Sequence, residues 1–174
     1  VCVFFFFQAQ SGIRVLVRSR GLGDLYKSQA AGRYSRHAEL VAPSAVRSRI
    51  NPLAPRALGE DEILQTIEDF GTAAALAREA GYDGVEVMGS EGYFLNQFTA
   101  ARTNQRTDGW GRSAENRRRL PVEVVGRVRK HCGPDFIIVY RISVLDLVEG
   151  GNSWPDVAAL AKDVEVSGAN ILNT

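Results

Sequence analysis

The sequence predicts an α/β fold built on a parallel sheet. Three observations support this: amphipathic helical segments alternate with short aliphatic runs, a glycine separates each helix from the run that follows it, and this unit occurs three times in succession. Strands joined through helices in this way lie parallel and are connected by right-handed crossovers. Three such units alone would leave open strand edges, so we expect other segments to complete the sheet.

The first unit combines a helix with the strand Val85–Met88. The helix begins at Gly59 and carries three acidic residues in its first turn, where the helix dipole favours them. Apolar residues then recur at spacings of one, three and four along one face as far as Ala80. Gly81 ends the helix, and Asp83 with the next glycine turns the chain into the strand.

The second unit follows the same plan. Ser113 is the expected N-cap of a helix that ends at Gly133. Pro121 lies inside this helical pattern and should kink the helix or restart it. An aliphatic run over residues 136–140 is the second strand, and it delivers Arg141 at its carboxyl end.

The third unit is a helix capped by Ser153, with Pro155 in its first turn. Gly168 ends this helix, and residues 169–173 begin the third strand. The segments that precede the three units are less regular. Residues 13–17 are typical of a strand. Residues 32–55 hold three prolines and scattered arginines, which predicts a long surface loop.

The composition is that of an ordinary globular protein, with 45% hydrophobic and 24% charged residues. A net charge of +1 gives no reason to expect nucleic acid or a membrane as a partner. The run Arg117–Arg119 is interpreted as the solvated face of a helix rather than a polyanion site. His37 and His131 have no evident partner and are expected at the surface.

The two cysteines, Cys2 and Cys132, are far apart in the chain, and neither has a second sulfur or a histidine at ligand spacing. We therefore expect no structural metal site and no disulfide framework. Reduced thiols of this kind fit a cytoplasmic location.

The most informative stretch runs from Gly84 to Asn116. In it the first strand ends abruptly in Gly-Ser-Glu-Gly, and Tyr93 follows at once. In parallel α/β folds the chemistry gathers at the carboxyl ends of the strands. A dense polar segment over residues 102–108, with two guanidinium groups, suits a phosphorylated or carboxylated ligand.

These residues resemble the old yellow enzyme family of NADH:flavin oxidoreductases, and within it the bacterial NADPH-dependent 2,4-dienoyl-CoA reductases of fatty-acid β-oxidation. The motifs that carry the resemblance are MGSEGYFLNQF, RTNQRTD, a WG turn, SxENRxR, GRYS, LVAPS, YRIS and LDLVE. The resemblance implies a partial (β/α)8 TIM barrel that contains only central βα units. A whole barrel needs about 250 residues, so the 174 residues are interpreted as part of a larger protein.

The resemblance also implies a division of the chain. Residues 31–174 form a partial FMN-binding barrel domain, whereas residues 1–30 match no part of the family and remain unassigned. A shifted reading frame upstream of Ala31 is one hypothesis for their different texture. Lys27 stands where the family has a glutamine that contacts flavin, so that role is not transferred to it.

Two residues receive roles in the chemistry from the resemblance. Tyr93 matches the proton donor, and a phenol with an ordinary pKa of about 10 is protonated at neutral pH. A packing role is the alternative. Arg141 matches the arginine beside the flavin pyrimidine edge, where a permanent cation stabilises the negative charge of the reduced ring. A structural ion pair is the alternative for this arginine.

Four residues of the polar loop, Thr103, Asn104, Gln105 and Arg106, match the segment that contacts the acyl-CoA substrate. An equally weighted alternative is that they pin the loop beside the barrel rim. Met88 and Glu91 replace the His and Asn with which many family members hold an enone carbonyl, which favours the dienoyl-CoA branch. Glu91 as a general base is a weaker alternative.

The resemblance implies FMN as the cofactor of this domain. The full-length family members also use FAD, a [4Fe-4S] cluster and NADPH, whose sites lie outside this chain, as does the second catalytic residue, a histidine. The expected partners are an acyl-CoA substrate and the missing barrel segments, without which we expect no catalysis. The alternatives are another branch of the family, such as an enone reductase or amine dehydrogenase, and a non-catalytic truncated half-barrel.

Overall fold

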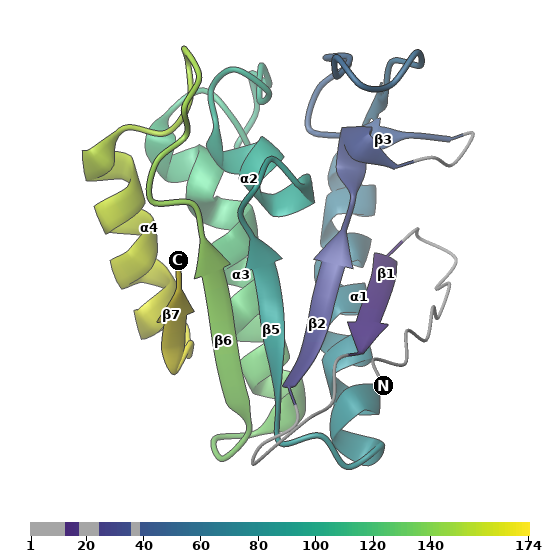
Figure 1. The fold of residues 1–174 in the computed structure, drawn as a ribbon, viewed down its shortest axis with the longest axis vertical. Helices are drawn as coiled ribbons and strands as arrows, with labels where there is room; N and C mark the ends of the chain where they lie inside the picture. The colour runs from purple at the N-terminus through teal and green to yellow at the C-terminus, as the bar shows by residue number, and fades with distance from the viewer. Residues whose placement is uncertain (1–12, 18–24, 36–38) are drawn as a thin grey trace.

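The computed structural model describes residues 13–17, 25–35 and 39–174. Its main element is a five-stranded sheet with the strand order β1-β2-β5-β6-β7 (Figure 1). β1 pairs antiparallel with β2, and every other neighbouring pair in this sheet is parallel. The strands are β1 Ile13–Val17, β2 Leu25–Ala30, β5 Gly84–Gly89, β6 Ile137–Ile142 and β7 Ile171–Asn173.

The predicted α/β fold with three consecutive helix–strand units is confirmed. The helices that precede the last three strands are α1 Glu60–Glu79, α3 Ala114–Cys132 and α4 Trp154–Val166. α1 and α3 lie behind the sheet in Figure 1 and pack against each other, and the opposite face of the strands, which carries neither of them, is here called the open face. The parallel sheet and its crossover helices make up part of a (β/α)8 barrel.

The helix ends follow the predicted capping residues. The Ser113 hydroxyl accepts a hydrogen bond from the Asn116 N–H at 3.1 Å, which satisfies one of the free donors of the first turn of α3. At α4, Ser153 and Asp156 form a capping box, in which the Ser153 hydroxyl donates to the carboxylate at 2.7 Å. Gly133 follows α3 with a φ of +78°, a conformation that costs a side-chain-bearing residue energy.

Of the two outcomes expected for Pro121, a restart of the helix is excluded, and a kink stays a prediction. α3 is one helix from Ala114 to Cys132 with Pro121 inside it. A proline in the helix interior lacks the N–H that would bond to the carbonyl four residues earlier. Pro121 is buried, and burial of its apolar ring offsets part of this loss.

The segment predicted as a surface loop over residues 32–55 holds some regular structure. It contains the 3-10 helix η1 Gly32–Tyr34 and the short strand β3 Val41–Ala42, which pairs in parallel with β4 Arg56–Ala57. Arg56 then donates two hydrogen bonds of 2.7 Å to the carboxylate of Glu62 in α1. The Arg56 guanidinium and the Gly59 N–H lower the pKa of Glu62 to about 2.

The expectations for the N-terminal segment have mixed outcomes. The strand expected over residues 13–17 is confirmed as β1. β2 lies in the segment that the sequence left unassigned, yet it pairs in parallel with β5 and so belongs to the main sheet. Lys27 of β2 is the register partner of Glu86 in β5. Cys2 and His37 lie outside the described residues.

The three arginines Arg117–Arg119 contact protein rather than only solvent, so their interpretation as a solvated face is wrong. Arg117 donates to the Thr99 carbonyl at 2.8 Å, and Arg118 pairs with Asp163 at 2.5 Å. The Arg119 guanidinium lies 4.0 Å from the centroid of the buried Trp110 ring. The run therefore joins α3 to α4 and to the loop before α3.

His131 is also partnered, contrary to the expectation from sequence. Its Nε2 lies 2.8 Å from a carboxylate oxygen of Glu68 in α1, and Arg127 forms an ion pair with the same carboxylate. This cluster links α1 to α3 on the outer side of the sheet.

None of the described helices is long and apolar enough to cross a membrane. In the same part of the chain, no three His, Cys, Asp or Glu side chains lie together in a group that could hold a metal ion. Cys132 is a free, buried thiol, and its burial raises its pKa.

Candidate active site

Side chains alternate between the two faces of β5 and β6, and this alternation creates the candidate site. Val85 and Val87 of β5 belong to the apolar core beneath the helices, as do Ile138 and Tyr140 of β6. The intervening residues of both strands point to the opposite face because successive side chains of a strand alternate. That face includes Glu86 and Met88 on β5 and Arg141 on β6.

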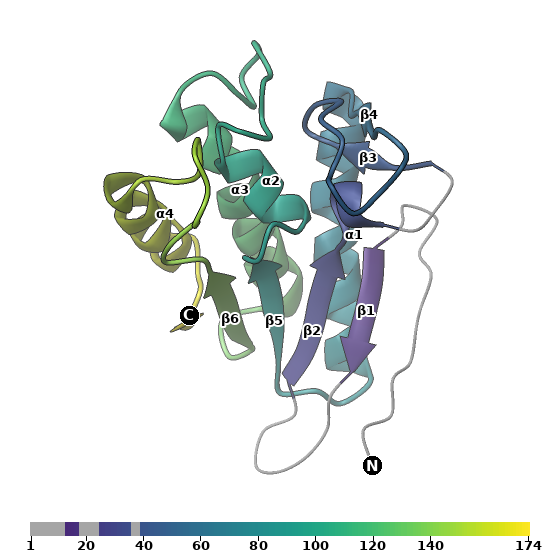
Figure 2. The same ribbon diagram turned by 45° about the horizontal axis from the view of Figure 1, so that its top comes forward.

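The loop after β5 leads from the carboxyl edge of the sheet into the short helix α2 Phe94–Thr99, which the sequence did not predict (Figure 2). Glu91 and Gly92 both adopt positive φ, at 59° and 73°, so the chain turns sharply. The Glu91 N–H donates to the Ser143 hydroxyl at 3.0 Å, which ties this loop to the one that follows β6. Tyr93 is the N-cap residue of α2.

Tyr93 is half-buried beside a second tyrosine. Its ring meets the Tyr34 ring edge to face, with the centroids 6.0 Å apart and an angle of 88° between the planes. The Tyr93 hydroxyl makes no hydrogen bond to any of the residues that the structure describes. The ring is therefore positioned by packing, and the role of its hydroxyl as a proton donor stays a prediction.

Gln97 of α2 holds the two tyrosine-bearing segments together, a role that the sequence did not reveal. Its side chain is almost completely buried, and its amide N–H₂ donates to the Gly92 carbonyl at 2.7 Å and the Ala31 carbonyl at 3.3 Å. Its carbonyl oxygen accepts from the Arg33 N–H at 3.1 Å. The only available signal was a polar residue inside the apolar α2 segment, and two of its three partners are more than sixty residues away.

Arg141 lies on β6 opposite Met88 of β5, two residues before the loop that contains Ser143. Its Nη1 donates to Glu91 at 3.1 Å, and its Nε lies 3.1 Å from an oxygen of Glu86. The Nε atom is buried but not aligned for a hydrogen bond to this or any other described group. An ion pair, the alternative considered for Arg141, is thus present, and it leaves one donor unsatisfied.

Three of the four residues predicted to bind substrate use their side chains to hold the loop. The Thr103 hydroxyl donates to the Gln97 carbonyl at 2.6 Å. The Asn104 amide donates to two carbonyls at 2.7 Å each, those of Phe98 and Trp110. Both side chains are buried, so their polar groups are already satisfied within the protein.

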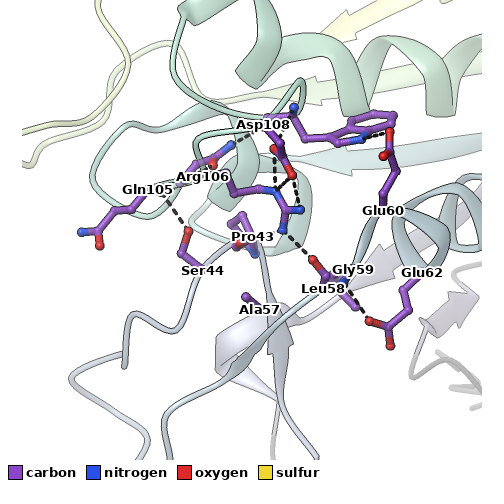
Figure 3. Close-up of polar contacts among 12 residues, drawn as sticks. Pro43, Ser44, Ala57, Leu58, Gly59, Glu60, Glu62, Gln105, Arg106 and Asp108 are labelled. Atoms are coloured by element: carbon purple, nitrogen blue, oxygen red, sulfur yellow. Dashed lines mark hydrogen bonds and ion pairs between the residues drawn. The ribbon is translucent and has the colours of Figure 1, made fainter.

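Arg106 connects the same loop to the segment around β3 and β4 (Figure 3). Its Nη1 donates to the Leu58 carbonyl at 2.6 Å and to the Pro43 carbonyl at 3.1 Å. Its other nitrogens bind Asp108, and this contact lowers the pKa of the Asp108 carboxyl. These contacts favour the pinning role for Arg106. Gln105 alone has an exposed side chain, so substrate contact by these four residues stays a prediction.

The comparison with known families covers most of the chain. The family model described as NADH:flavin oxidoreductase / NADH oxidase family matches residues 23–173. This chain belongs to that family. The match begins nine residues before the first of the motifs that suggested it and includes β2, in agreement with the parallel pairing of β2 with β5.

Individual family members match at moderate identity. The NADH oxidase of Thermoanaerobacter brockii is 39% identical over 133 residues, which are 76% of this chain and 20% of that protein. A solved 2-naphthoyl-CoA reductase complex is 33% identical with a TM-score of 0.72, and the match covers 83% of this chain and 23% of that one. Morphinone reductase is 33% identical with a TM-score of 0.72, and the match covers 82% of this chain and 44% of that one. The chain spans less than half the length of each of these proteins.

A cavity of about 390 Å³ opens between the loops of this flavin oxidoreductase domain. Its walls come from η1, from the loop after β5 and from the loop after β6. They include Arg33, Tyr34, Glu91, Arg102, Leu145 and Val148. Neither Tyr93 nor Arg141 lines it, whereas Glu91 after β5, Ser143 after β6 and Thr103 of the polar loop do.

The residues at the sheet edge fit the pyrimidine side of a flavin. Arg141 provides a permanent cation with a buried, unsatisfied Nε, and negative charge of a reduced flavin gathers at the edge such a cation would contact. Met88 is the register partner of Arg141 and is buried within the protein. No phosphate-binding role is assigned to any of the described residues.

Proposed function

We propose that this chain supplies the proton donor and the cofactor-facing cation of an FMN-dependent oxidoreductase that reduces 2,4-dienoyl-CoA thioesters with electrons from NADPH. Tyr93 is the donor, and Arg141 contacts the cofactor. Further barrel segments complete the cytoplasmic enzyme and hold the FAD and the [4Fe-4S] cluster that pass electrons from NADPH. The exposure of Ile171 and Leu172 on the terminal strand β7 supports the need for such segments.

The observation that carries this proposal is the meeting of two loops and one cation at a single edge of the sheet. The parallel register places Met88 opposite Arg141, and Tyr93 begins α2 only four residues after β5 ends. Glu91 bridges the two strands through its bond to Arg141 and its N–H contact with Ser143. This edge is where barrel enzymes of this type place their chemistry.

The reaction needs a hydride at one carbon of the activated double bond and a proton at the other. Bound FMN supplies the hydride. Tyr93 supplies the proton from a hydroxyl that no described protein group engages, and NADPH returns the two electrons through the remaining domains. Packing of Tyr93 on Tyr34 fixes the ring, so the hydroxyl is oriented before the substrate arrives.

Met88 and Glu91 support the dienoyl-CoA branch because they depart from the residues with which many family members hold an enone carbonyl. A buried thioether and a carboxylate engaged by Arg141 offer no neutral hydrogen-bond donor to an enone carbonyl. The similarity to a 2-naphthoyl-CoA reductase, which by its name acts on a CoA thioester, supports the same substrate class. Gln105, with its exposed side chain, is the member of the polar loop best placed to contact the acyl-CoA.

A chimera tests the proposal. Residues 31–173 replace the matching segment of morphinone reductase, whose solved structure defines the junctions. The chimera is expected to retain flavin absorbance and to reduce 2,4-dienoyl-CoA. Tyr93→Phe should lower kcat by about 10²- to 10⁴-fold, the usual contribution of a positioned acid, with the flavin still bound. Tyr82→Phe, in the turn between α1 and β5, is the matched control and should keep full activity.

Two outcomes would count against the proposal. Reduction of cyclic enones without reduction of dienoyl-CoA would move the chain to the enone-reductase branch of the family. Full activity of Tyr93→Phe would remove the proton-donor role. The 174 residues alone, supplied with FMN and NADPH, should reduce no dienoyl-CoA above the blank, and a failure of the chimera to bind flavin would favour a non-catalytic half-barrel.

A further inference from the structure

Arg141 lies between two carboxylates whose surroundings differ. Glu86 lies within β5 and its side chain is only 12% exposed, whereas the Glu91 side chain in the following loop is 54% exposed. The second oxygen of Glu86 accepts a hydrogen bond from the Asn173 amide at 2.8 Å. Glu86 therefore connects Arg141 to β7 through buried contacts, while Glu91 reaches Arg141 from the solvent side.

The backbone around Glu91 is held in place independently of its side chain. Its φ of +59° is uncommon for a residue other than glycine, and it persists only where neighbouring contacts enforce it. The contact that does so is the hydrogen bond from its N–H to the Ser143 hydroxyl. Only rotation of the side chain is then needed to move the carboxylate away from Arg141.

We propose that Glu91 is an exchangeable counter-ion of Arg141, which a ligand edge of hydrogen-bond acceptors displaces, while Glu86 is the fixed counter-ion that positions the guanidinium. The inference rests on the proposed function, which makes that edge the pyrimidine side of FMN. An exposed ion pair is weak and easily exchanged, whereas a buried charge must keep its partner. The displaced Glu91 carboxylate returns to water, and the ligand meets a cation that Glu86 has already oriented.

Titration of the chain with FMN, followed by flavin fluorescence, tests the two roles with matched neutral substitutions. Glu91→Gln removes the competitor and should lower Kd about two- to fivefold, in line with the strength of an exposed ion pair. Glu149→Gln makes the same change in net charge at an exposed residue that forms no ion pair with Arg141, and should leave Kd unchanged. Glu86→Gln should raise Kd by about tenfold, because it breaks a buried pair.

The contrary results are equally specific. If Glu91→Gln and Glu149→Gln lower Kd equally, the effect comes from net charge alone, and the proposed exchange of Glu91 is wrong. Binding by Glu91→Gln no tighter than that of the wild type would do the same. Tighter binding by Glu86→Gln would overturn its positioning role, since loss of a merely neutralising carboxylate would strengthen an anion site.

A flavin-free measurement separates this inference from the proposed function. In the ligand-free chain, nitrogen NMR of the Arg141 guanidinium should show Nη signals that shift when NaCl reaches about 0.5 M, because salt screens exposed pairs more than buried ones. Glu91→Gln should abolish the shift, and the Nε signal facing Glu86 should not respond. If no variant binds FMN but the Nη signals respond to salt as expected, Glu91 is still an exchangeable counter-ion of Arg141, whereas the proposed contact of Arg141 with flavin is wrong. Salt-insensitive Nη signals in the wild type would overturn the inference.

Discussion

The two faces of β6 differ: one packs into the apolar core, and the other carries Arg141 of the candidate site. On the helix face, Ile138 and Tyr140 are completely buried in an apolar core. On the other face, Arg141 carries a charge that is paired with two carboxylates, those of Glu86 and Glu91, each at 3.1 Å. A strand in a parallel sheet is ordinarily aliphatic on both faces, because helices or the barrel interior cover it.

The difference teaches that the open face is not selected for stability. Charges held at a strand end cost desolvation energy unless they are paired and hydrogen-bonded. The Arg141 Nε atom lies 3.1 Å from a Glu86 oxygen but is not aligned for a hydrogen bond to it, so packing within the protein leaves this guanidinium incompletely satisfied. The contrast predicts that substitutions on the helix face reduce stability, whereas those on the open face mainly alter binding.

The largest effect on stability is expected at Ile138. Ile138→Ala removes a fully buried side chain and should lower the free energy of unfolding by about 2–5 kcal/mol. Its neighbour Ile137 is 36% exposed, so Ile137→Ala should cost clearly less. Urea unfolding followed by circular dichroism measures both. Equal losses at the two positions would show that the helix face does not dominate the stability of the strand.

The next largest effect on stability tests whether Asn104 holds the polar loop in place or is free to bind substrate. Asn104→Ala leaves two buried carbonyl groups without their donor and should lower the free energy of unfolding by about 1–3 kcal/mol. Gln105→Ala, at the adjacent exposed position, should change it by no more than about 0.5 kcal/mol. Thermal unfolding of the pair measures this difference. If Asn104→Ala leaves the free energy of unfolding unchanged, Asn104 does not hold the loop, and its predicted substrate-binding role would be favoured.

Local signals explain which parts of the fold the sequence predicted. Ser113 and Ser153 were identified as caps because a cap depends on residues only three positions away. The three helix–strand units were recognised from periodicity and from the glycines between them. β3 and β4 are only two residues long, too short for a periodic signal, and their pairing depends on the main chain of a distant segment.

The candidate site was predictable only in part for the same reason. Tyr93 and Arg141 follow recognisable strand ends, and the family resemblance assigned their chemistry. Gln97 and Glu86 were missed because a buried polar residue shows its role only through partners that are far away in sequence. The roles of Asn104 and Arg106 in holding the loop likewise depend on carbonyl groups that the sequence alone cannot locate.

The smallest expected effect on stability concerns Tyr140, on the helix face of β6. The Tyr140 hydroxyl is buried without a hydrogen-bond partner among the described residues, and burial raises its pKa. It lies so close to the Gly89 backbone that a Cβ added at Gly89 would be 2.0 Å away from it. Tyr140→Phe removes the unsatisfied group and keeps the ring, so the chain should become more stable by about 1 kcal/mol.

Thermal and urea unfolding of Tyr140→Phe beside the wild type measure this gain, and Tyr82→Phe serves as a control at a half-buried tyrosine that has a partner. A loss of stability in Tyr140→Phe would mean that the hydroxyl has a partner after all, such as a buried water molecule. The Tyr140 hydroxyl on the helix face would then have a hydrogen-bond partner. The buried side-chain nitrogens without a hydrogen bond among the described residues would then be the Nε atoms of Arg33 and Arg141, and that of Arg141 lies on the open face of the sheet.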